Sequence, residues 1–135
     1  MGTLIAKLNL SSTNLSTDAL NINLKNILTV AGDTRLFRKV LAAAEDELLT
    51  DQLLLAASAY GKSYVLLHNL SATSAEIITV GLAANDGTGD EALDTTQLAL
   101  GAGEFAFFPW DSSIDLVADA ASGTPTIEIG VFEVA

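Results

Sequence analysis

Short apolar segments alternate with turn-forming segments throughout residues 62–135, and this pattern constrains the fold more than any other feature. The apolar segments are rich in β-branched and aromatic side chains, and the segments between them are rich in Gly, Asn, Asp and Ser. Strands favour the first composition and tight turns favour the second. Short strands with short connections are typical of an all-β protein with an antiparallel β-sandwich, jelly-roll-like in architecture.

The positions of the strands follow from the same pattern. Residues 64–69 and 76–82 are expected to be adjacent antiparallel strands because a short polar segment separates them. Residues 85–90, with the sequence NDGTGD, form the strongest loop signal in the chain, since these residue types accept the backbone angles of tight turns. Further strands are predicted at residues 96–100, 105–110, 114–118 and 127–134.

The first thirty residues show an alternation of period two. Leu4, Ala6, Leu8 and Leu10 share one face of the segment, opposite Ile5, Lys7 and Asn9, as in a half-buried strand. Residues 20–25 repeat the alternation after a Ser-, Thr- and Asn-rich turn. The pattern predicts an N-terminal hairpin or arm over about residues 1–30, attached to a single β-sandwich domain that spans residues 1–135.

Residues 35–59 admit more than one interpretation. A strand over residues 35–42 followed by an irregular acidic segment is favoured, because apolar residues do not form a clear helical stripe there. One short helix around residues 42–50 is the alternative, since AAAEDELL consists of good helix formers. Residues 53–57 are expected to form a buried strand or a packed loop.

Composition excludes several classes of function. The longest apolar runs are far shorter than the ~20 residues of a membrane helix, and the N-terminal residues do not resemble a secretory signal. No cysteine is present, so disulfides and thiolate metal sites are excluded. A net charge of −11 repels nucleic acid and anionic membranes. Neither is expected as a partner.

Three of the six basic residues, Arg35, Arg38 and Lys39, lie within five positions of one another. One interpretation is a solvated strand edge that discourages aggregation. The other is a basic patch that docks onto an acidic neighbour, such as another copy of this chain. On the second interpretation these three residues belong to an interface.

The sequence offers few groups for catalysis or cofactor binding. His68 is the sole histidine, and at a strand end it is expected to be a hydrogen-bonded or exposed side chain. Glu104 with Asp111 or Asp115 is a conceivable glycosidase pair, although sequence cannot show the required separation. The acidic loop at residues 85–91 resembles a calcium loop only loosely, and a solvated turn is preferred. We therefore expect no enzyme activity, no cofactor and no metal.

The densest aromatic segment is FAFFPW at residues 105–110. In a strand, Phe105 and Phe107 face one side while Phe108 and Trp110 face the other. A single small core does not readily bury all four rings. One pair is therefore expected in the core, and the other lies under a loop or faces a partner subunit.

Residues 64–71 (YVLLHNLS), 77–82 (IITVGL), 98–110 (LALGAGEFAFFPW) and 126–133 (TIEIGVFE) together resemble a broad group of small virion structural proteins of tailed bacteriophages. The resemblance covers roughly the last 75 residues. It implies a capsid decoration or cement protein on the outer capsid surface, made in the host cytoplasm. It also implies a homotrimer that binds the major capsid protein and stabilises contacts between capsid subunits.

Two other functions compete with this interpretation. A carbohydrate-binding or host-contact module of a tail or fibre protein would present Trp110 or Tyr60 as a flat platform for a sugar ring. An enzyme with paired carboxylates ranks last, because no nucleophile, base and charge stabiliser can be named together.

Overall fold

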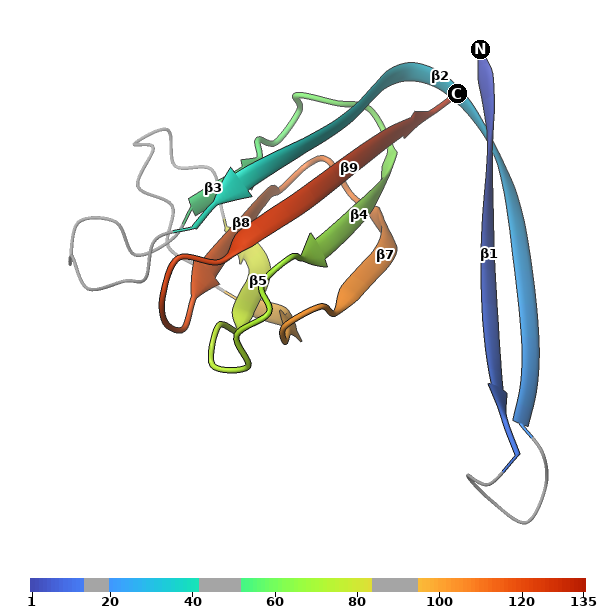
Figure 1. Ribbon diagram of the computed structural model, residues 1–135. Coiled ribbons are helices and arrows are strands. Elements are labelled where there is room, and N and C mark those ends of the chain that lie inside the picture. Colours follow the sequence, from blue (N-terminus) through green and yellow to red (C-terminus); the bar gives the residue numbers. More distant parts are fainter. Residues whose placement is uncertain (14–19, 42–51, 84–94) are drawn as a thin grey trace.

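A computed structural model describes residues 1–13, 20–41, 52–83 and 95–135 of the chain (Figure 1). All regular structure within these residues is β-strand, arranged in two antiparallel sheets that pack face to face, as the sequence predicts. The alternative helix around residues 42–50 and most of the acidic segment lie outside the described residues. No helix in the described part of the chain is long and apolar enough to cross a membrane.

The strands agree closely with the periodicity of the sequence. In chain order they are β1 (Gly2–Ser12), β2 (Leu20–Val40), β3 (Gln52–Leu55), β4 (Ser63–Asn69), β5 (Ile78–Ala83), β6 (Thr95–Leu100), β7 (Phe105–Trp110), β8 (Asp115–Ala120) and β9 (Thr126–Val134).

The order of the strands is that of a jelly roll with one added strand. One sheet has the order β1-β2-β9-β4-β7 and the other has the order β3-β8-β5-β6. Without β1, the two sheets hold four strands each, and the chain passes from one sheet to the other at most connections. This double-sheet arrangement of eight strands is the jelly-roll architecture. The predicted fold class is confirmed.

One predicted strand pairing is wrong. Residues 64–69 and 76–82 were expected to be neighbours, but β4 and β5 lie in different sheets, where β4 pairs with β7 and β9, and β5 pairs with β6 and β8. Nδ2 of the buried Asn69, at the end of β4, donates a hydrogen bond to the carbonyl oxygen of Glu76, just before β5, and so joins the two ends of the connection between the sheets. Strand periodicity alone does not distinguish a hairpin from such a crossing.

The core lies between the two sheets. In β4 the residues alternate between buried and half-buried, with Val65 and Leu67 inside and Tyr64 and Leu66 outside, as expected for a strand with one face in the core. The buried core cluster consists of Leu41, Leu54, Leu55, Val65, Leu67, Ile78, Val80, Leu100, Trp110, Leu116, Ala118, Ala120, Ile127, Ile129 and Val131.

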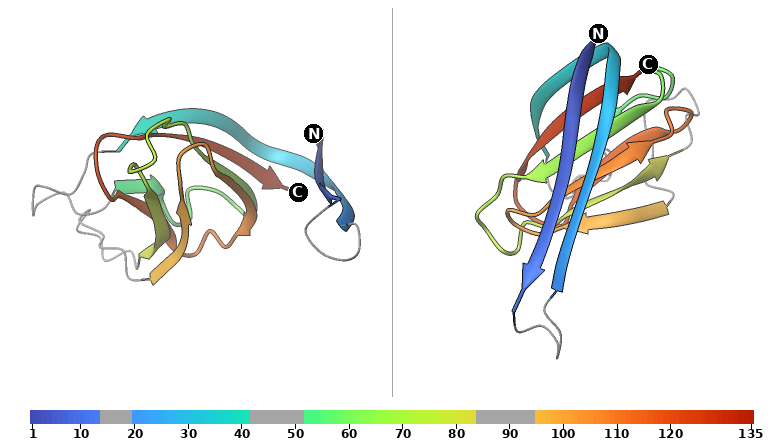
Figure 2. Two further views of the ribbon diagram at one scale, coloured as in Figure 1. Left: turned by 60° about the horizontal axis from the view of Figure 1, so that its bottom comes forward. Right: turned by 90° about the vertical axis from the view of Figure 1, so that its right-hand side faces the viewer.

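The expected N-terminal hairpin is present and leaves the sandwich. β2 is 21 residues long. Its first half pairs with β1, and its second half pairs with β9 after a register shift between Val30 and Thr34. Figures 1 and 2 show β1 and the first half of β2 as a two-stranded arm that extends beyond the end of β9.

Candidate self-association surface

The β1–β2 hairpin has one apolar face and one largely polar face. Residues directly opposite each other in an antiparallel pair point to the same side of the ribbon. One face therefore carries the pairs Leu4 with Leu28, Leu8 with Leu24, and Leu10 with Ile22. The other carries Lys7 with Lys25, Asn9 with Asn23 and Ser11 with Asn21, interrupted by the pair Ile5 with Ile27.

The apolar face of the hairpin is largely open to solvent. Leu28 is buried, whereas Leu8 is 43% exposed, Leu10 is 44% exposed and Leu24 is 60% exposed. The sequence predicted a half-buried strand here, and the alternation is correct. Most of the apolar side nevertheless remains exposed to solvent, because the hairpin extends away from the sandwich. This depends on the tertiary structure and not on the alternation of the sequence.

A second apolar surface lies on the outer face of the five-stranded sheet. The register aligns Phe107 of β7 with Leu66 of β4 and Gly130 of β9, and in the next row Tyr64 is beside Phe132. The Tyr64 and Phe107 rings stack with centroids 5.5 Å apart, and the Phe107 and Phe132 rings meet edge-on at 6.3 Å. These side chains therefore form a continuous patch across three strands.

Gly130 allows the patch to pack closely. A Cβ atom at this position would lie 3.1 Å from Cε2 of Phe132 and 3.3 Å from Cβ of Leu66, which is tighter than ordinary van der Waals contact. The absence of a side chain lets the Phe132 ring lie over the backbone of its own strand.

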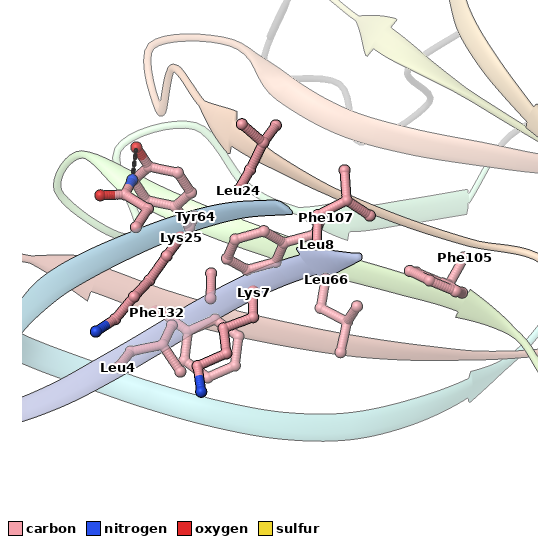
Figure 3. A pocket seen from close by; sticks show the side chains of 12 residues that line it. Leu4, Lys7, Leu8, Leu24, Lys25, Tyr64, Leu66, Phe105, Phe107 and Phe132 are labelled. Atoms are coloured by element: carbon pink, nitrogen blue, oxygen red, sulfur yellow. Dashed lines mark hydrogen bonds between the residues drawn. The ribbon is translucent and has the colours of Figure 1, made fainter. Parts of the chain in front are cut away.

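The hairpin and the outer sheet face enclose an apolar groove of about 640 Å³ (Figure 3). Figure 3 shows the leucines of the hairpin beside the rings of Tyr64, Phe107 and Phe132. Nδ2 of Asn26 donates a hydrogen bond of 3.4 Å to the Tyr64 hydroxyl and ties the hairpin to the sheet. The lining consists of Leu4, Ala6, Lys7, Leu8, Leu24, Lys25, Asn26, Tyr64, Leu66, Phe105, Phe107 and Phe132.

The four aromatic residues of the predicted interface divide between the two faces of β7. Phe105 is 65% exposed, and Phe107 is also exposed beside the groove. Trp110 is buried in the core, where its Nε1 donates a hydrogen bond of 3.2 Å to the carbonyl oxygen of Ile114. Phe108 packs against the same core. The predicted alternation is confirmed, and of these four only Phe105 and Phe107 lie at the candidate surface.

The three clustered basic residues do not form one patch. Leu36 and Arg38 are on the outer face of the sheet, where Nε of Arg38 donates to Oε2 of Glu128 at 3.0 Å. Arg35 and Lys39 point to the opposite side by strand alternation. Nζ of Lys39 donates to the carbonyl oxygen of Leu53 at 2.7 Å, and burial lowers the pKa of its ammonium group. Lys39 thus links β2 to the other sheet.

The carboxylates that suggested a glycosidase pair contact nearby backbone amides. Oε2 of Glu104 accepts a hydrogen bond of 2.7 Å from the Gly101 amide, and Oδ1 of Asp111 accepts one of 3.1 Å from the Ser113 amide. Asp115 is buried and accepts from the Ala57 amide. Each contact stabilises a loop or turn.

The remaining candidate groups are structural or lie outside the described residues. His68 lies on the outer face of β4 and meets the Phe105 ring edge-on at 6.4 Å. No group of His, Asp and Glu residues suited to a metal ion occurs among the residues that the structure describes. The acidic loop at 85–91 lies outside them.

The contribution of Tyr64, Leu66 and Phe132 to the outer patch was not anticipated from the sequence. Both faces of β4 are apolar, so the run YVLL gives no sign of which side is covered. The run of aromatic residues in β7 was the only available signal.

The comparisons with known proteins bear on the fold. No family model matches the sequence, and a search of curated proteins found no match. The chain is similar in structure to one from Bacillus endospore appendages, which are described as a family of disulfide-linked pili. The TM-score is 0.50 at 15% identity, and the match covers 91% of this chain and 100% of the other. The similarity supports a shared β-sandwich architecture over nearly the whole chain.

Proposed function

We propose that this protein is a non-enzymatic structural subunit that associates with copies of itself in a larger assembly. The observation that carries the proposal is the exposed apolar surface formed by the hairpin and the outer face of the five-stranded sheet. Large exposed apolar patches rimmed by polar residues are typical of protein contact sites. A chain of net charge −11 is otherwise well suited to remain soluble and separate, so this apolar surface requires a specific explanation.

A capsid decoration or cement protein of a tailed bacteriophage is the first specific form of this proposal. The resemblance in residues 64–133 and the jelly-roll strand order support it. In this form the protein is a homotrimer on the outer capsid surface, with the major capsid protein as its partner and with neither nucleic acid nor membrane.

A subunit of a surface filament is the second form. It is favoured by the structural similarity to a chain from endospore pili, which extends over the full length of that chain. Because this protein contains no cysteine, its subunits would be held by non-covalent contacts, unlike disulfide-linked pili.

Electron microscopy of the purified protein, with and without purified phage capsids, tests both forms. Discrete oligomers that bind capsids and raise their resistance to heat support the decoration protein. Filaments formed by the protein alone support the second form. A protein that stays monomeric at high concentration and binds no capsid contradicts both.

The carbohydrate-binding alternative has weaker support. Trp110 is buried, and Tyr60 is half-buried and packs against the core, so neither presents an open ring face of the kind that a sugar platform needs.

A further inference from the structure

The strands at the edges of the two sheets differ in how readily they can pair with another chain. Among the described strands, β1 and β7 are the edges of one sheet, and β3 and β6 are the edges of the other. β3 has four residues and β6 has six, and the pairing of each contains a register shift. β7 has six residues and includes Pro109, which has no amide N–H to donate. Short length, irregular pairing and proline are features by which edge strands avoid pairing with other chains.

β1 has none of these three features. It is 11 residues long, contains no proline, and pairs with β2 in an unbroken register. Within the described part of the chain it pairs with no other strand. Its outer edge therefore presents a long, regular row of backbone N–H and C=O groups that can accept a further strand.

The hairpin gains most from a partner that brings both strands and an apolar face. A two-stranded hairpin is only marginally stable in water, whereas three or more strands with an apolar face can be stable. In an antiparallel pair, residues directly opposite each other point to the same side. A second β1 strand, paired about a two-fold axis through one of its residues, thus sets apolar side chains opposite apolar ones by symmetry. These side chains are Leu4, Ala6, Leu8 and Leu10.

We propose that β1 pairs antiparallel with β1 of a second copy, with the two-fold axis at Leu8, so that two hairpins form one four-stranded sheet. An axis at Lys7 would set two ammonium groups directly opposite each other, which is destabilising. An axis at Ala6 would set the apolar Ile5 opposite Lys7. The axis at Leu8 sets Lys7 opposite the polar Asn9 and brings together two leucines that are each 43% exposed in the single molecule.

This inference rests on the proposed function and specifies one contact by which the copies associate. The contact is isologous, because the same strand edge is used by both copies, and it closes at two copies. A larger particle or filament therefore combines this contact with another surface of the subunit.

Cysteine cross-linking tests the position of the axis. The chain has no cysteine of its own. In Leu8→Cys the two opposed Cα atoms would be about 4.5 to 5.5 Å apart, which is within the range of a disulfide. The control is Leu24→Cys, which lies opposite Leu8 in the hairpin, on the same face, and is more exposed at 60%. In the proposed sheet, Leu24 and its counterpart are three strand spacings apart, or about 14 Å.

We expect mild oxidation to convert Leu8→Cys to a covalent dimer and to leave Leu24→Cys largely monomeric on a non-reducing gel. Exposure alone would favour the second variant, so the expected order cannot arise from accessibility. Equal yields, or a higher yield from Leu24→Cys, would overturn the inference.

Lysine variants at the same two positions give a readout without a cross-link. Leu8→Lys sets two ammonium groups opposite each other across the axis and should weaken self-association by about tenfold. Leu24→Lys should have a smaller effect, because it lies away from the axis. Both residues line the groove, so a contact made through the groove would be weakened by both. Sedimentation velocity measures self-association, and circular dichroism checks folding. Equal weakening by the two variants would overturn the pairing of β1.

The outcomes separate this inference from the proposed function. If the wild type assembles but the variants at Leu8 and Leu24 behave alike, the pairing of β1 is wrong while the structural function stands. If the wild type is monomeric at every concentration, the proposed function is wrong, and the pairing of β1 is wrong with it.

Discussion

Asn69 shows how one side chain stabilises the connection between the two sheets. It is fully buried, and its Nδ2 donates to the carbonyl oxygens of Glu76 at 2.8 Å and Leu100 at 3.0 Å. Its Oδ1 accepts a hydrogen bond from the Ser71 amide at 3.0 Å. The sequence predicts Asn69 only as the last residue of a strand. Its role as a buried connection depends on strands that are distant in the chain.

Replacement of Asn69 by Ala is expected to lower the free energy of unfolding by about 3 kcal/mol, since buried carbonyl and amide groups lose their partners. Urea denaturation measures the change. Asn23→Ala is the control, because this exposed side chain bonds only to Asn21 in the described contacts, and it should change stability by less than about 0.5 kcal/mol. Equal effects of the two substitutions would contradict this role for Asn69.

Because the ammonium group of Lys39 is partly buried, the free energy of unfolding is expected to vary with pH in the alkaline range. Burial lowers its pKa in the folded protein, while the unfolded chain keeps a value of about 10.4. Between these two values the unfolded state binds more protons, so stability rises with pH. The stability of the wild type relative to Lys39→Met should therefore increase as the pH approaches about 10.4. Urea denaturation from pH 8 upward tests this, and a constant difference would contradict it.

At the scale of the element, the hairpin is distinct from the sandwich. Among the described side chains of the hairpin, only Leu28 is buried, and it does not belong to the core cluster. The second half of β2, in contrast, completes the sheet beside β9 and places Phe37 against the core. One continuous strand thus has two roles, whereas the sequence predicts two separate strands over residues 20–25 and 35–42.

Deletion of residues 1–29 is expected to leave the jelly roll folded, because the deleted segment contributes little to the core. Far-ultraviolet circular dichroism should retain a β-sheet spectrum with cooperative thermal unfolding. Self-association should be lost, since the exposed apolar face of the hairpin and one wall of the groove are removed. A truncated protein without cooperative unfolding would show that the hairpin is part of the folding unit.

At the scale of the whole molecule, the uneven distribution of charge is the main electrostatic feature. Residues 1–40 carry a formal charge of +3 and residues 41–135 carry −14, so that each copy has a net charge of −11 and repels the next. Repulsion between solvent-exposed charges of the same sign is screened by salt, with a Debye length of about 10 Å at 0.1 M.

Self-association through the apolar surface should therefore strengthen as the salt concentration rises from about 0.05 M to about 0.5 M, where the Debye length has shortened markedly. Sedimentation velocity at several salt concentrations measures this change. Weaker self-association at higher salt would contradict this expectation and would show that attraction between charges holds the copies together.

The sequence by itself determined the all-β class, most strand positions, the hairpin and the alternation of the rings in β7. These properties depend on local periodicity and turn chemistry, which each segment carries within itself. The tertiary structure alone decided that β4 and β5 lie in different sheets, that the clustered basic residues face opposite sides, and that apolar faces of the hairpin and of β4 remain exposed. Each of these depends on which distant strand lies alongside, and apolar residues on both faces of a strand leave that choice open.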